Sequence, residues 1–152
     1  MMTLTESFNS LKSYISGYIS ASFTTAAITA GTPVQLDMTN LVAVFAKNFE
    51  VVASGIKYTG EANIKTQGVT AISMTGNTNN TIAKFYRGKN NVIDLTTELK
   101  RKSQVAGDLG ALPITGGGSI ETGDIINFYV DSSLGGTITV ENFNFTIENI
   151  TL

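Results

Sequence analysis

The chain contains no cysteine and no histidine among its 152 residues. The absence of cysteine excludes a disulfide framework and a thiol nucleophile. The absence of histidine removes the commonest general base and the commonest transition-metal ligand, so zinc sites and histidine-dependent triads are excluded as well. Carboxylate, lysine or tyrosine chemistry remains open, but nothing in the spacing of those residues points to a reaction. We therefore expect a protein that is not an enzyme and that needs no cofactor or metal.

Charge and long apolar runs are also scarce. Charged residues make up 14% of the chain, against roughly 25% in a typical soluble domain. The formal net charge of −2 gives no strong basic footprint for nucleic acid or for an anionic membrane. No apolar run approaches the roughly 20 residues of a transmembrane helix, and residues 1–6 lack the basic and apolar regions of a signal peptide. We expect a protein made in the cytoplasm, with no nucleic-acid or membrane partner.

The clearest element is the strand predicted for residues 125–130. A Gly-Asp turn precedes it, and it is rich in β-branched and aromatic residues. One face consists of Ile126, Phe128 and Val130 and is typical of a core. The opposite face is too apolar for solvent, and its members are Ile125, Asn127 and Tyr129. Such a strand is buried on both sides, either by a second sheet or by another chain.

A second strand, predicted over residues 69–75, has the same property. Thr70, Ile72 and Met74 share one side. The other side consists of small, barely polar residues, namely Val69, Ala71 and Ser73. Several further short strands separated by turn clusters predict a two-sheet antiparallel sandwich. We expect a long, glycine-rich loop over residues 106–119 and turns at 77–80 and 87–91.

Residues 3–20 are the one helical candidate. Phe8, Leu11, Ile15 and Ile19 recur at helical spacing and would form one face. From Ile15 onward the sequence also alternates, so a strand is an open alternative. The segment could pack on its own domain, dock on a larger assembly, or remain disordered. We divide the chain into an attachment arm, residues 1–24, and a sandwich domain, residues 25–152.

Two sets of charged residues are candidate binding sites. The spacing of Asp108, Asp124, Asp131 and Glu141 matches no calcium loop. We interpret them as turn carboxylates, with Asp124 accepting hydrogen bonds from the backbone of its own turn. The basic cluster at residues 100–102 is interpreted as a solvated face, the alternative being a contact to an acidic capsid surface or a polysaccharide.

These motifs carry a family resemblance. Gly123-Asp124 followed by Ile126, Phe128 and Val130 resembles a strand of the complement globular-head and tumour-necrosis-factor jelly rolls. The chain is more similar to small bacteriophage virion proteins of the head-fibre, decoration and fibre-tip kinds. That similarity lies in five ordered segments between residues 49 and 150, which are residues 58–61, 69–74, 82–90, 123–130 and 138–147.

The resemblance implies an all-β jelly roll with a short helical or extended N-terminal arm, assembled as a homotrimer. It places two groups of residues against neighbouring subunits at a threefold axis: Val69, Ala71, Ser73, Ile125, Asn127 and Tyr129. It also implies attachment to the major capsid protein, or another virion protein, through Phe8, Leu11, Ile15 and Ile19. The expected protein is a non-enzymatic decoration of the capsid surface. The alternative is a fibre tip that recognises a host glycan or protein through the loops at 77–80, 87–91 and 106–119. A cellular trimeric ligand is disfavoured by the lack of cysteine and of a signal peptide.

Overall fold

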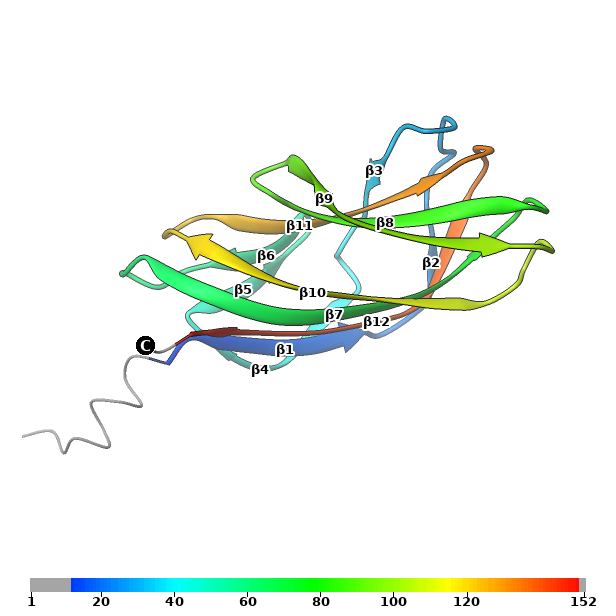
Figure 1. Cartoon of the computed structure of the whole chain (residues 1–152). Helices are drawn as coiled ribbons and strands as arrows, with labels where there is room; N and C mark the ends of the chain where they lie inside the picture. The colour runs from blue at the N-terminus through cyan, green and yellow to red at the C-terminus, as the bar shows by residue number, and fades with distance from the viewer. Residues whose placement is uncertain (1–11, 151–152) are drawn as a thin grey trace, which may run out of the picture.

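The computed structural model describes residues 12–150, which form two antiparallel β-sheets packed face to face (Figure 1). This confirms the predicted all-β sandwich. No helix in the described part of the chain is long and apolar enough to cross a membrane.

Sheet I has the strand order β10-β7-β12-β1-β4, and β2 also pairs with β12. Its strands are β1 (Tyr14–Ile19), β2 (Phe23–Thr24), β4 (Leu41–Lys47), β7 (Ile64–Gly76), β10 (Gly110–Ile120) and β12 (Ile138–Asn149). The last strand lies between β7 and β1, so the two ends of the described chain are joined within one sheet: Tyr14 faces Glu148 in the register.

Sheet II has the order β5-β6-β11-β8-β9, and β3 pairs with β11. Its strands are β3 (Val34–Gln35), β5 (Phe49–Val52), β6 (Gly55–Tyr58), β8 (Thr81–Lys89), β9 (Val92–Ser103) and β11 (Ile125–Ser132). The β8–β9 hairpin turns through Asn90 and Asn91, whose φ angles are 52° and 64°. Positive φ at both turn positions matches the right-handed twist of the flanking strands, and asparagine tolerates it.

Alternating residues from both sheets fill the space between them. At the centre the rings of Phe85, Phe128 and Phe143 meet; the centroids of Phe128 and Phe143 are 4.9 Å apart, in an edge-to-face arrangement. Such aromatic contacts add about 0.5–1.5 kcal/mol to simple burial. Ile126 and Val130 point into the same core, as their alternation predicts.

One open alternative is decided, and one prediction about an element is corrected. Residues 14–19 form a strand, the alternative that the alternation from Ile15 allowed, and β1 lies between β12 and β4 inside sheet I. Residues 110–120 are strand β10, not a loop, because the glycines at 116–118 pair with residues 66–68 of β7. In both places backbone pairing with distant strands decides the conformation over local composition.

Candidate interface on the outer face of sheet I

The outer face of sheet I exposes apolar side chains. On β7, Thr70, Ile72 and Met74 point into the core, so the intervening Val69, Ala71 and Ser73 point outward. These three therefore share the outer face, as the alternation predicts, and the Val69 side chain is 50% exposed.

Strands β1 and β4 extend this apolar face. Tyr14 and Tyr18 of β1 are exposed, with Tyr18 opposite Val42 of β4 in the register. On β4, Val44 is also exposed, and Phe45 is 66% exposed. Strand β4 is the edge of the sheet, and residues 42–46 are all exposed. Long apolar edge strands are a hazard for aggregation unless something covers them. Sequence reasoning missed Tyr14 and Tyr18, because it left open whether their segment is a helix or a strand.

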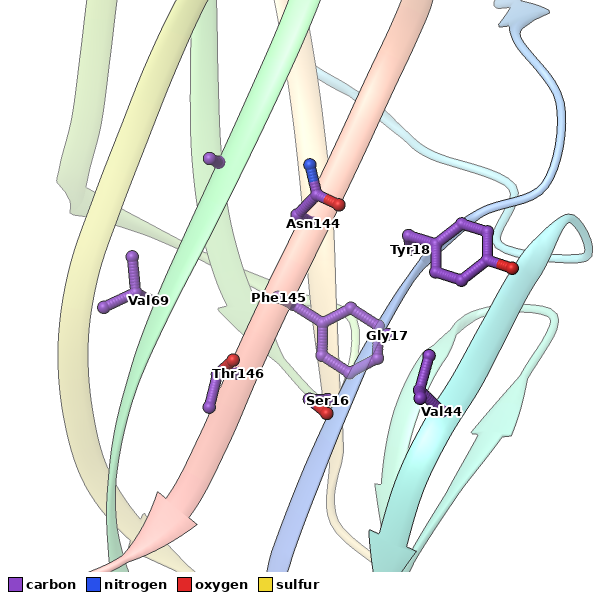
Figure 2. Close-up of a pocket in the computed structure, with 9 residues that line it drawn as sticks. Ser16, Gly17, Tyr18, Val44, Val69, Asn144, Phe145 and Thr146 are labelled. Carbon is purple, nitrogen blue, oxygen red and sulfur yellow. The ribbon is translucent and has the colours of Figure 1, made fainter.

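The centre of the outer face is a shallow hollow of about 360 Å³ (Figure 2). Small or polar residues form most of its floor, and apolar side chains stand at its sides. Its lining residues are Ser16, Gly17, Tyr18, Val44, Val69, Ala71, Asn144, Phe145 and Thr146. Charged residues are absent from this lining, which is typical of the core of a protein–protein contact.

The other predicted interface residues lie elsewhere. Ile125, Asn127 and Tyr129 are on β11, in the middle of sheet II. The Asn127 side chain is 0% exposed, because Nδ2 donates to the Ser54 carbonyl at 2.7 Å and Oδ1 accepts from the Asn91 N–H at 2.7 Å. The chain thus covers this face itself, and the structure does not bring the two predicted groups together.

Tyr129 belongs to the same covered face and is 7% exposed. Its hydroxyl has no hydrogen-bond partner among residues 12–150, and burial raises its pKa. Tyr86, which is opposite Tyr129 in the register, differs because its hydroxyl has a partner: it donates to Glu98 at 2.7 Å. Burial is the larger cause and this hydrogen bond the second cause of a raised pKa for Tyr86.

Of the four residues predicted to dock on the capsid, two lie in the core and two lie outside the described residues. Ile15 and Ile19 are buried in the core between the sheets, which corrects their assignment to a docking surface. A side chain that fills its own core cannot at the same time contact a capsid. Phe8 and Leu11 lie outside the described residues.

The carboxylates act within the domain. Asp124 accepts from the Glu121 N–H at 3.0 Å, within its own turn as predicted, and it also pairs with Lys89 at 3.1 Å. Buried Asp131 lies 3.3 Å from Lys84 Nζ. Among residues 12–150 no group of three or more acidic side chains could hold a metal ion.

The predicted recognition loops do not gather at one end. Residues 77–80 meet the β9–β10 connection, where Asn79 accepts from the Ala106 N–H at 2.7 Å. The turn at 87–91 lies at the other end of β8, because β8 runs from Thr81 to Lys89.

No protein-family model matches this chain, and neither does any curated protein. Solved structures do match. The vertex protein P5 of PRD1 aligns with a TM-score of 0.53 and 14% identity, covering 91% of this chain and 97% of that one. The Eiger tumour-necrosis-factor protein of S. frugiperda aligns with a TM-score of 0.58 and 9% identity, covering 91% and 94%.

Murine APRIL aligns with a TM-score of 0.52 and 11% identity, covering 88% of this chain and 98% of its own. At such identities the similarity establishes the fold, which is the jelly roll of the tumour-necrosis-factor type, and nothing finer.

Proposed function

We propose that this chain is a non-enzymatic bacteriophage virion protein that assembles as a homotrimer and decorates the capsid surface. The observation that supports the assembly is the outer face of sheet I, where Tyr18, Val44 and Val69 are exposed around an uncharged hollow. No other strand of residues 12–150 covers this face, and apolar patches of this kind mark interaction sites. In the trimer, each copy presents this face toward a threefold axis.

The small residues of the face suit this role. Ala71, Ser73 and Ser16 leave the backbone accessible, so that neighbouring chains can approach one another closely. An assembly of three copies with rotational symmetry closes on itself and does not grow into a fibre. Closure would also cover the exposed edge strand β4 near the axis.

A virion location is supported by the likeness to the PRD1 vertex protein P5. We assign capsid attachment to the segment before β1, which contains Phe8 and Leu11. Three such segments on one trimer bind a symmetric site more strongly than one segment does, because the second and third contacts form at high effective concentration. The partner is the major capsid protein or another protein of the virion.

Cosedimentation with emptied phage capsids tests this function. We expect the full chain to pellet with the shells, to saturate at a fixed ratio, and to remain in the supernatant when residues 1–11 are deleted. The deletion variant should keep its trimeric mass, so loss of binding would report attachment and not assembly. Binding to host cells instead of shells would overturn the decoration role and favour the fibre-tip alternative.

A further inference from the structure

A groove separates the β8–β9 hairpin from β10, at the end of the sandwich where β12 finishes. Its volume is about 600 Å³, within the range of small-molecule sites. One wall is the segment of β10 at residues 116–119. The other wall belongs to the hairpin and includes Arg87, Val92, Ile93 and Thr97.

Glycines keep this groove open. Leu112, Ile114 and Ile120 of β10 point into the core, and Gly116 and Gly118 occupy the same face of the strand. A Cβ at Gly118 would meet no atom within 4 Å, and one at Gly116 would meet only Arg87, at 3.4 Å. Side chains at these positions would fill the space, so their absence creates it.

Arg87 points into the space between the sheets. It continues the inward alternation of β8 after Phe85, and it borders a small gap together with Ile126 and Phe128. Across residues 12–150, no carboxylate lies within 4.0 Å of its guanidinium group. A half-buried arginine with no carboxylate in contact is costly, so an anion entering the groove would be favoured.

Asp94, whose charge acts on Arg87, does not form an ion pair with it. Asp94 is opposite Arg87 in the strand register. Its Oδ1 instead accepts from the Thr96 N–H at 2.9 Å and from the Thr96 hydroxyl at 2.6 Å. Burial lowers the pKa of Arg87, and the charge of Asp94 opposes that effect only in part.

We propose that this groove binds a sugar that bears a carboxylate, with Arg87 holding the carboxylate through its planar pair of N–H groups. Arginine recognises carboxylates in this bidentate way. A singly charged carboxylate fits better than a phosphate, because the Asp94 carboxylate nearby repels a second negative charge.

The rest of the groove suits a sugar ring. Strand β10 is the edge of sheet I, so alternate N–H and C=O groups at residues 116–119 are not paired within the sheet. The Ser119 carbonyl accepts from Lys89 Nζ at 3.4 Å and the Gly118 carbonyl accepts from the Thr66 hydroxyl at 3.1 Å, so the remaining outward groups are the ones that can meet sugar hydroxyls. Lys89 also lines the groove, but its charge is already paired with Asp124 at 3.1 Å, so Arg87 is the cation that the site relies on. Val92, which is 70% exposed, offers an apolar surface to the ring. This site does not depend on the proposed trimer or on a virion location.

The test is a titration of the ¹⁵N-labelled full chain, followed by NMR. The probes are sodium galacturonate and sodium N-acetylneuraminate, with galactose and methyl galacturonate as uncharged controls. We expect saturable shifts at the amides of residues 116–119 and at Arg87 Nε–H for the acidic sugars. The uncharged sugars should bind at least about tenfold more weakly, since a charge-assisted hydrogen bond is lost.

Three variants assign the site. Arg87→Gln should weaken acidic-sugar binding about tenfold to a hundredfold, and Gly118→Val should weaken it by filling the groove while leaving Arg87 in place. Lys102→Gln removes the same charge from an exposed position of β9 outside the groove lining and should bind like the parent. Thermal unfolding of each variant establishes that it is folded; should Arg87→Gln not fold, Gly118→Val decides.

Several results would overturn the assignment. They are an absence of binding, equal binding of methyl galacturonate, unchanged binding in both Arg87→Gln and Gly118→Val, or tighter binding of inorganic phosphate or of a glutamate-rich peptide. Native mass spectra of the same samples keep this test separate from the proposed assembly. If the trimer is absent but sugar binding remains, the result contradicts the proposed trimer and leaves the sugar site standing.

Discussion

Phe145 packs beneath β1 because residue 17 is glycine. A Cβ at Gly17 would overlap the carbonyl oxygen of Val42 and would lie 2.7 Å from the Phe145 ring. At Gly17, β1 therefore contacts both of its neighbouring strands closely, since Val42 is on β4 and Phe145 is on β12. The sequence gives no sign that Gly17 differs from the glycines of the turns.

We predict that Gly17→Ala destabilises the domain by about 1–3 kcal/mol, the usual cost of overpacking. The matched control is Gly118→Ala, where the added methyl group meets nothing within 4 Å. Its free energy of unfolding should stay within about 1 kcal/mol of the parent value. Urea denaturation of the two variants measures the difference, and equal stabilities would contradict the close packing at Gly17.

Asp124 gives a prediction about pH. Burial raises its pKa, but hydrogen bonds from Asn90 and the Glu121 N–H, and the charge of Lys89, outweigh burial, so the pKa is lowered overall. A carboxyl whose pKa is lower in the folded state contributes stability above its unfolded value of about 3.9. That stability is lost as the pH falls through the folded value.

Asp124→Asn should therefore be less stable than the parent at pH 7, by about 1–2 kcal/mol, and the gap should close near pH 2. Denaturant titrations at the two pH values measure this. A gap of the same size at both values would show that Asp124 acts through its shape and not through its charge.

At the scale of elements, β1 is the strand for which the local pattern left helix and strand both open. Ile15 is 0% exposed and Ile19 is 9% exposed, and the strand hydrogen-bonds to β12 on one side and to β4 on the other. Removing it would expose the core, would leave β4 without a partner in the sheet, and would leave one side of β12 unpaired. The part of the chain that holds the sandwich together therefore begins before residue 24.

We predict that deletion of residues 1–11 leaves a cooperatively folded domain, because every described strand begins at or after Tyr14. Deletion of residues 1–24 should abolish cooperative unfolding, since the loss of two buried isoleucines alone costs several kcal/mol out of a total of about 5–15 kcal/mol. Circular dichroism during thermal unfolding compares the two. A folded 25–152 fragment would restore the division into arm and domain at residue 24.

At the scale of the whole molecule, the sandwich has two unequal outer faces. Sheet II is covered at β11 by the chain's own polar contacts, such as the Asn127 side chain against Ser54. Sheet I exposes Val44, Val69 and Tyr18 instead. The proposed assembly therefore predicts that only changes on sheet I alter the oligomeric state.

Val69→Asp should convert the trimer to monomers, because three carboxylates would be brought together and desolvated near the axis. Leu134→Asp is the matched control, since Leu134 is similarly exposed but lies in the connection between β11 and β12, outside the strands of sheet I. Native mass spectrometry should give about three times 16.1 kDa for the control and a single chain for Val69→Asp. A trimer in both variants would remove sheet I from the interface.

The alternation of apolar and polar residues in the sequence was sufficient to predict the fold class and the direction of several side chains. It predicted the sandwich, the inward residues Ile126, Phe128 and Val130, and the common outward face of Val69, Ala71 and Ser73. These follow from local geometry, because successive side chains of a strand point to opposite faces whatever the strand pairs with.

Only the tertiary structure decided which strands are neighbours. That pairing placed β11 and β7 in different sheets, turned the glycines of residues 116–118 from a loop into an edge strand, and put Ile15 and Ile19 into the core. It also brought Arg87 to the glycines of β10, nearly thirty residues further along the chain. Alternation shows that a face must be covered, but it contains no information about which distant segment covers it, because strand pairing depends on long-range contacts.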